Sequence, residues 1–208
     1  MTERVVMVHG LWMHGVAMMP LGWRLSRCGF TVAHFSYRSV RRPLEENARR
    51  LADLLQVLDA QTLHVVGHSL GGIVALRALA LRNEPRVRRV VLMGSPLAGS
   101  IAGRGLARFR AGRWMLGQSL PLWSDRSPPE VPPGVEIGVI AGCLPLGLGR
   151  LFARLPEPND GVAVLDEAQH PDAVDSIVLR TNHTGMLLSA RVAQQICTFL
   201  RDGRFGHD

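Results

Sequence analysis

The stretch LHVVGHSLGGIVAL, residues 63–76, decides the fold of this chain. Its first four residues are typical of a buried strand and its last four of an apolar helix. Between them Gly67, Ser69 and Gly71 form the pattern G-x-S-x-G, which between a strand and a helix is a nucleophile elbow. The glycines let strand and helix approach each other, and Ser69 then lies at a helix N-terminus. The alternative is an ordinary Gly/Ser loop, which would not need apolar runs on both sides.

The rest of the chain alternates strand-like and helix-like segments, which predicts an α/β fold with helices on both faces of the sheet. We expect a doubly wound, mostly parallel sheet of six strands with right-handed crossovers. The expected strands are 5–9, 31–35, 63–66, 87–93, 135–141 and 173–179, and the expected helices are 17–28, 44–58, 72–81 and 188–199.

The composition is that of one soluble globular domain over residues 1–208, since 47% of the residues are hydrophobic and 20% are charged. The formal net charge is +7. A basic chain can bind nucleic acid or an anionic membrane surface. Here the arginines are scattered and few aromatic residues accompany them, so we expect no nucleic-acid partner.

Three widely spaced cysteines, Cys28, Cys143 and Cys197, argue against a disulfide framework and favour a reducing compartment. No signal-peptide pattern precedes the first apolar run, and no stretch reaches transmembrane length. We therefore expect a cytoplasmic protein. The sequence also has no metal-ligand spacing, phosphate loop or dinucleotide fingerprint, so we expect no metal and no cofactor.

The alternation fails at residues 98–134, where Gly, Arg and Pro are dense, and again at 142–158. Apolar residues in the first of these inserts suggest a cap or lid over an acyl chain; the alternative is extra core at the sheet edge. Its arginines fall on several faces, so no clean membrane-surface helix is predicted. Arginines near the site mouth would favour an anionic substrate such as a phospholipid or an acyl-thioester. We expect no membrane partner beyond a transient surface contact.

A serine nucleophile needs a base, and in an open α/β sheet the base comes from a loop at the carboxyl end of a strand. Among eight histidines, only His183 follows the last expected strand and precedes the last helix. We expect the others to be structural or solvent-facing: His34 and His64 in the core, His68 packed beside the serine, and His14, His170 and His207 facing solvent.

The base needs a carboxylate that fixes its tautomer. Asp160 lies in a turn-rich loop after the fifth expected strand, and the order Ser69, Asp160, His183 is one that hydrolytic sites use. Two alternatives stay open: Asp160 caps a helix that begins at residue 162, or another carboxylate takes the role. The candidates for that role are Asp166, Asp172 and Asp175.

An oxyanion hole needs two backbone N–H donors. One is expected at Leu70, directly after the nucleophile. The other is expected in the loop after the first strand, at Leu11 to within one residue, with Gly10 permitting the turn and His9 structuring it.

The segments VHGL (8–11), GHSLGG (67–72), NDGV (159–162) and HTGM (183–186) resemble the signatures of α/β-hydrolase-fold lipases and carboxylesterases. The layout is similar to that of the small bacterial members. The resemblance implies a single α/β-hydrolase domain with a cap-like insert at 98–134. It also implies a catalytic triad of Ser69, Asp160 and His183, with Leu11 and Leu70 as oxyanion donors.

The leading hypothesis is a serine ester hydrolase that acts through an acyl-enzyme on a hydrophobic acyl ester or lipid. A thioesterase or an acyltransferase would use the same residues. A module that binds a hydrophobic ligand without catalysis is the alternative from a different class of protein.

Overall fold

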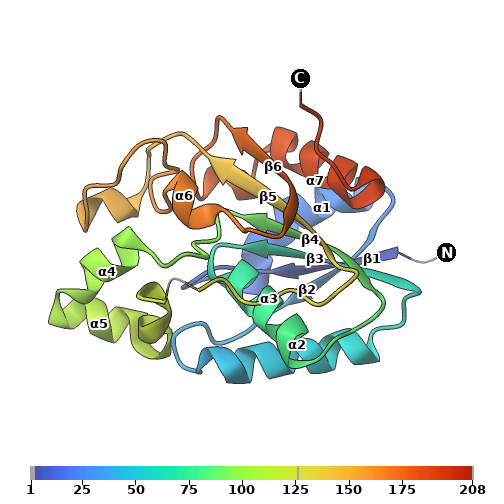
Figure 1. The fold of residues 1–208 in the computed structure, drawn as a ribbon, viewed down its shortest axis with the longest axis horizontal. Helices are drawn as coiled ribbons and strands as arrows, with labels where there is room; N and C mark the ends of the chain where they lie inside the picture. Colours follow the sequence, from blue (N-terminus) through green and yellow to red (C-terminus); the bar gives the residue numbers. More distant parts are fainter. Residues whose placement is uncertain (1–2, 126, 208) are drawn as a thin grey trace.

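A computed structural model describes residues 3–125 and 127–207, and within these ranges it contains one six-stranded sheet (Figure 1). All neighbouring strands are parallel, and their order is β2-β1-β3-β4-β5-β6. The predicted fold class is therefore confirmed, and three of the expected strands have the predicted bounds. The strands are β1 (Glu3–Val8), β2 (Thr31–Phe35), β3 (Thr62–His68), β4 (Val87–Met93), β5 (Glu136–Gly142) and β6 (Ala173–Leu179).

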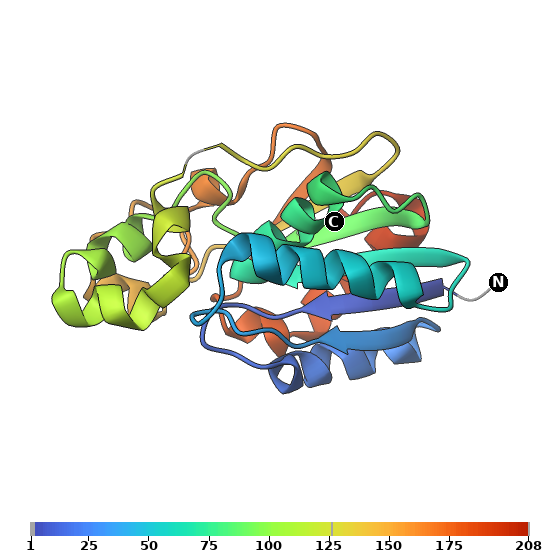
Figure 2. The same ribbon diagram turned by 90° about the horizontal axis from the view of Figure 1, so that it is seen from below.

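Within the described ranges four long helices cover the sheet, two on each face, as Figures 1 and 2 illustrate. One apolar core lies under α2 (Leu44–Val57) and α3 (Leu70–Leu81), and a second lies under α1 (Met19–Arg27) and α7 (Ala190–Asp202). The central strands are buried on both faces, which explains why they appear in the sequence as continuous apolar runs. Two short 3-10 turns, η1 (Gly15–Met18) and η4 (Gly185–Leu187), precede α1 and α7.

The insert at 98–134 contains more regular structure than its composition predicts. It forms α4 (Ile101–Ala107), α5 (Arg110–Leu116) and the 3-10 segment η2 (Gly117–Trp123). Figure 2 shows these helices beyond the end of the sheet at which the strands finish, together with η3 (Leu148–Leu151) from the second insert. A further short helix, α6 (Leu165–Ala168), precedes β6. The inserts therefore lie where a parallel sheet binds its ligands.

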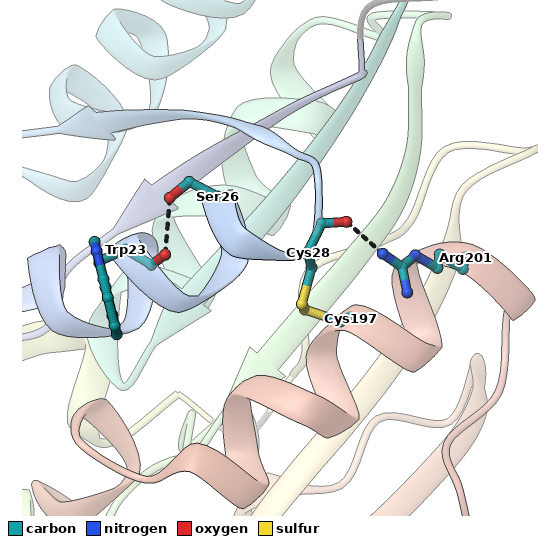
Figure 3. Close-up of a disulfide and its surroundings, with 5 residues drawn as sticks. All are labelled: Trp23, Ser26, Cys28, Cys197 and Arg201. Atoms are coloured by element: carbon teal, nitrogen blue, oxygen red, sulfur yellow. Dashed lines mark hydrogen bonds between the residues drawn. A yellow bond between two sulfur atoms is a disulfide. The ribbon is translucent and has the colours of Figure 1, made fainter.

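The expectation that the cysteines form no disulfide is wrong, because Cys28 and Cys197 are bonded to each other (Figure 3). The bond joins the C-terminal end of α1 to α7, two helices that lie side by side on one face of the sheet. Residues 169 positions apart gave no local signal of this pairing. The argument for a reducing compartment, which used the cysteine count, therefore loses its basis. Cys143 is free.

Two histidines also differ from expectation. His34 is exposed because it lies on β2, an edge strand. His170 is buried: its Nε2 lies 3.2 Å from the Pro129 carbonyl oxygen, and its Nδ1 accepts a hydrogen bond from the Asp172 amide.

Across the described part of the chain, none of the helices combines the length and the apolar character needed to cross a bilayer.

Candidate active site

Ser69 lies at the sharp turn between β3 and α3, with φ 54° and ψ −125°. A positive φ is costly for a residue with a side chain, so the surrounding structure must enforce it. The flanking glycines show how. A Cβ on Gly67 would lie 2.5 Å from Gly72 Cα, and a Cβ on Gly71 would lie 2.6 Å from the His9 carbonyl oxygen. Only glycine permits this approach of strand, turn and helix.

His183 and Asp160 form a buried pair. The two atoms that join them, His183 Nδ1 and Asp160 Oδ2, are 2.7 Å apart, and the His183 amide also donates to the Asp160 carbonyl oxygen. Because the carboxylate accepts, Nδ1 carries the proton and Nε2 is left with a free lone pair. Burial by itself would raise the pKa of Asp160, but His183 and two backbone amides together hold that pKa below its ordinary value.

The Asp160 carboxylate also stabilises its own loop. Asp160 Oδ1 accepts hydrogen bonds from the amides of Val162 and Ala163, at 2.9 and 2.7 Å. The capping alternative is therefore partly right, although the atoms cap a turn and no helix begins at residue 162. The second insert leaves β5 and then returns to the end of that strand. The evidence is that a Cβ on Gly142 would lie 2.9 Å from Asp160 Cβ.

The competing carboxylates lie elsewhere. Asp166 and Asp172 are exposed. Asp175 accepts from the Phe205 amide and pairs with His207 near the C-terminus. None of these three described residues makes a hydrogen bond or ion pair with His183, so the structure brings Asp160 to the histidine and leaves the others apart from it.

The loop that carries Leu11 is held by a stacked pair, His9 and Tyr37. The Tyr37 amide donates to His9 Nε2, so His9 is neutral with its proton on Nδ1, which donates to the Gly10 carbonyl oxygen at 2.9 Å. Burial lowers the pKa of His9, which favours this neutral form. The Tyr37 hydroxyl donates to the His9 carbonyl oxygen. The sequence predicted a structuring role for His9 but gave no indication of Tyr37. The contact between these two residues forms only because β2 pairs with β1.

The two residues expected as oxyanion donors belong to segments that meet at the serine. Leu70 is the first residue of α3, so its amide has no partner within the helix. A Cβ on Gly10 would lie 3.1 Å from Ser69 Cβ, which places the loop 9–12 against the nucleophile. Trp12 follows with φ 59°, and its amide donates to Ser39 Oγ.

His68 packs beside the serine as expected, and it does more than fill space. Its Nε2 donates to the His183 carbonyl oxygen at 3.0 Å, and the two rings lie 4.7 Å apart. Burial lowers the pKa of His68 to about 3, so the ring stays neutral. His68 therefore ties the histidine loop to the nucleophile elbow, a contact between residues 115 positions apart.

Ser69 and His183 open into the same cavity, which has a volume of about 320 Å³. Its walls come from the loop after β1, the elbow and both inserts. The lining is mainly apolar, and among the described residues it includes no arginine and no carboxylate. The large apolar side chains that the inserts and the Asp160 loop contribute to its lining are Leu106, Leu116, Trp123, Leu148, Phe152 and Val162. No cluster of three or more potential metal ligands occurs among residues 3–125 and 127–207.

The family model of the alpha/beta hydrolase family matches residues 5–205. This chain is a member of the alpha/beta hydrolase family. The resemblance inferred from four short motifs therefore extends over nearly the whole chain, and the six parallel strands are those of a small member of the family.

Among solved structures, the chain is similar to the mature lipase BlEst2 from Bacillus licheniformis, with 19% identity and a TM-score of 0.69 over 95% of this chain and 90% of that one. It is also similar to an esterase from Exiguobacterium antarcticum, with 15% identity and a TM-score of 0.69 over 96% and 92% of the two chains. At these identities the likeness establishes the fold.

A curated relative, the 2-hydroxy-6-oxononadienedioate/2-hydroxy-6-oxononatrienedioate hydrolase of Paraburkholderia xenovorans (strain LB400), is 47% identical over 55 residues. The match covers 26% of this chain and 19% of the relative. It is therefore a local similarity that spans under a fifth of that protein.

Proposed function

We propose that this alpha/beta hydrolase is a serine ester hydrolase with Ser69 as nucleophile, His183 as base and Asp160 as the acid that orients the base. The observation that carries the proposal is that Ser69 and His183 line one cavity while Asp160 holds His183 Nδ1 at 2.7 Å. This leaves Nε2 as the atom able to accept a proton inside the cavity.

In the proposed reaction, Ser69 Oγ attacks the ester carbonyl carbon and His183 Nε2 takes the hydroxyl proton. The tetrahedral intermediate collapses, the C–O bond breaks, and His183 gives the proton to the departing alcohol. Water then attacks the acyl-enzyme with His183 again as base, which releases the acid and restores Ser69. The amides of Leu11 and Leu70 would stabilise the oxyanion in both steps, each by roughly 3 kcal/mol.

The cavity favours an uncharged, apolar acyl group. Its wall of leucine, tryptophan and phenylalanine side chains would bury a hydrocarbon chain, and no cation lines it to bind a carboxylate. A dienedioate, which the curated relative's name gives as its substrate, would bring two carboxylates into this lining. Desolvating them without partners is costly, so we propose a neutral carboxylic ester.

The test is labelling with a fluorophosphonate probe, together with hydrolysis of p-nitrophenyl esters from acetate to palmitate. We expect Ser69 to be labelled, and Ser69→Ala to lose labelling and hydrolysis. The matched control is Ser26→Ala, which removes an exposed hydroxyl on α1. A folded protein that takes up no label, or Ser69→Ala that still hydrolyses esters, would rule out the proposed nucleophile.

The same residues would serve a thioesterase or an acyltransferase, and products formed from thioesters and from added alcohols separate these activities. A non-catalytic module would bind an apolar ligand with no turnover of any ester, and its affinity would be unchanged in Ser69→Ala.

A cytoplasmic location stays a prediction. Cysteine labelling with and without reductant in the native host tests whether Cys28 and Cys197 are bonded there.

A further inference from the structure

Exposed apolar side chains lie on and next to α5 and η3, two segments that each contribute residues to the cavity wall, and we call these side chains the apolar rim. Its most exposed members are the residues Trp114 and Leu151, which are 81% and 74% accessible. Groups of this size are rarely left in water without a partner when they gather on one surface. The rim consists of Phe109, Trp114, Met115, Leu146, Leu148 and Leu151.

The rim comes from two segments that are far apart in sequence but meet in space. Both α5 and η3 pack against α4, and Figures 1 and 2 place all three at the same end of the molecule. Leu148 also lines the cavity, and the Trp12 indole donates to the Met115 carbonyl oxygen beside the loop that carries Leu11. The rim therefore meets the cavity at Leu148 and the loop that carries Leu11 at Met115.

The charge of these two segments is of one sign. Residues 101–123 and 143–156 contain six arginines and no acidic residue. Within the described part of the chain, the side chains of four of them make no ion pair or hydrogen bond, whereas the side chains of Arg104 and Arg150 donate to backbone carbonyl oxygens. The unpaired arginines are Arg108, Arg110, Arg113 and Arg154.

We propose that the rim and its arginines dock this protein on an anionic lipid surface. A bilayer interface offers an apolar layer for Trp114 and Leu151 next to negatively charged headgroups for the arginines. Tryptophan is suited to that boundary because its ring is apolar and its N–H is polar. In this orientation the cavity opens toward the membrane, so an apolar ester could enter without crossing water.

A second copy of this chain fits the rim less well. A pairing of two rims would bring twelve arginines together with no carboxylate from either segment, and like charges at close range repel. An anionic lipid surface supplies the missing negative charge. The charge complementarity therefore decides between the two occupants.

The experiment is co-sedimentation of the full chain with vesicles, one set of phosphatidylcholine alone and one of phosphatidylcholine and phosphatidylglycerol in equal parts. We expect binding to the anionic vesicles that weakens as salt is raised. The double variant Trp114→Ser with Leu151→Ser should bind at least about tenfold more weakly, because it removes two apolar groups that the membrane interface would bury. The triple variant Arg108→Gln, Arg110→Gln, Arg113→Gln should lose about fivefold per charge.

Matched controls remove the same residue types elsewhere. Trp23→Ser replaces an exposed tryptophan that also lies beside arginines, and Arg49→Gln with Arg50→Gln removes two exposed charges of α2. Circular dichroism verifies that each variant is folded. We expect both controls to bind like the native chain.

Three results would overturn the proposal: no binding to anionic vesicles, equal binding to both vesicle types, or rim variants that bind like the controls. Elution of the native chain as a dimer that only the rim variants convert to monomer would assign the rim to a second copy. Docking does not need catalysis, so Ser69→Ala should bind vesicles normally. A failure of the vesicle test therefore leaves the proposed hydrolysis untouched. Likewise, a failure of the labelling and hydrolysis tests leaves the proposed docking untouched.

Discussion

Asp160 uses each of its carboxylate oxygens for a different task. Oδ1 accepts two backbone amides and fixes its own loop, while Oδ2 accepts the proton of His183 Nδ1. A single aspartate therefore sets both the position of the loop and the tautomer of the histidine. These two roles explain why the sequence is compatible both with a capping role and with an acid role for Asp160.

Asp160→Asn tests the second task. The asparagine oxygen can still accept from the loop amides, but its NH2 group then faces His183 Nδ1. The imidazole must turn or shift its proton to Nε2, which removes the lone pair that would accept from Ser69. We expect ester hydrolysis to fall about 10⁴-fold while the fold is retained. Steady-state kinetics on a p-nitrophenyl ester measures this, and a loss below tenfold would remove Asp160 from the proposed mechanism.

The same residue makes stability depend on pH. The pKa of Asp160 in the folded chain lies below its ordinary value of 3.8, so the unfolded chain binds the proton more readily. The stabilisation is complete above the unfolded value and is lost as pH falls through the folded one. We expect denaturation at pH 7 and at pH 3 to show a smaller acid loss in Asp160→Asn than in the native chain. An equal loss in both would contradict the assignment.

At the scale of elements, α1 and α7 are joined by more than packing. Cys28 at the end of α1 is bonded to Cys197, and the Arg201 side chain donates to the Cys28 carbonyl oxygen (Figure 3). A cross-link over 169 positions restricts the unfolded chain strongly, because almost the whole polypeptide lies within the loop. The two helices that cover one face of the sheet are thus held together covalently.

Cys28→Ser should lower the free energy of unfolding by about 2–5 kcal/mol, since the unfolded chain gains entropy. The measurement is denaturant unfolding of the native chain and the variant, each with and without a reductant. Cys143→Ser is the control, because Cys143 is a free thiol and its variant should keep the response to reductant. A native chain whose stability does not change on reduction would show that the bond contributes little.

At the scale of the whole molecule, the first insert is joined through Glu167 to the segment that follows Asp160. Its carboxylate accepts from the amide of Ile101 at the start of α4 and from the amide of Val164, at 2.5 and 3.1 Å. Its carbonyl oxygen accepts from the amides of Leu97 and Ala98. The cap-forming segment and the segment that follows Asp160 are therefore joined at one buried side chain.

Glu167→Gln should loosen this attachment, because its NH2 group would face one of the two amide donors and leave that donor unpaired. We expect a cost of about 1–3 kcal/mol and faster trypsin cleavage at the arginines of residues 101–113. Limited proteolysis followed by mass spectrometry identifies the cut sites. Glu130→Gln changes an exposed glutamate of the same insert and serves as the control. Equal cleavage of the two variants would exclude Glu167 as the attachment point.

The local sequence was enough for the parallel sheet, the elbow and the alternation of strands and helices. Apolar runs, glycines and their spacing act within a few residues, so they can be interpreted without tertiary structure. The same holds for placing Ser69, His183 and Asp160 after three different strands. Their roles as a catalytic set remain a proposal.

Only the tertiary structure decided the contacts between distant segments. The Cys28–Cys197 bond, the hydrogen bond from His68 to the His183 carbonyl oxygen and the bracing of His9 by Tyr37 each join residues from separate elements. The two inserts likewise form one cavity wall only because η3 of the second insert packs on α4 of the first. Such contacts depend on how elements are placed in space, a property that no local pattern of residues contains.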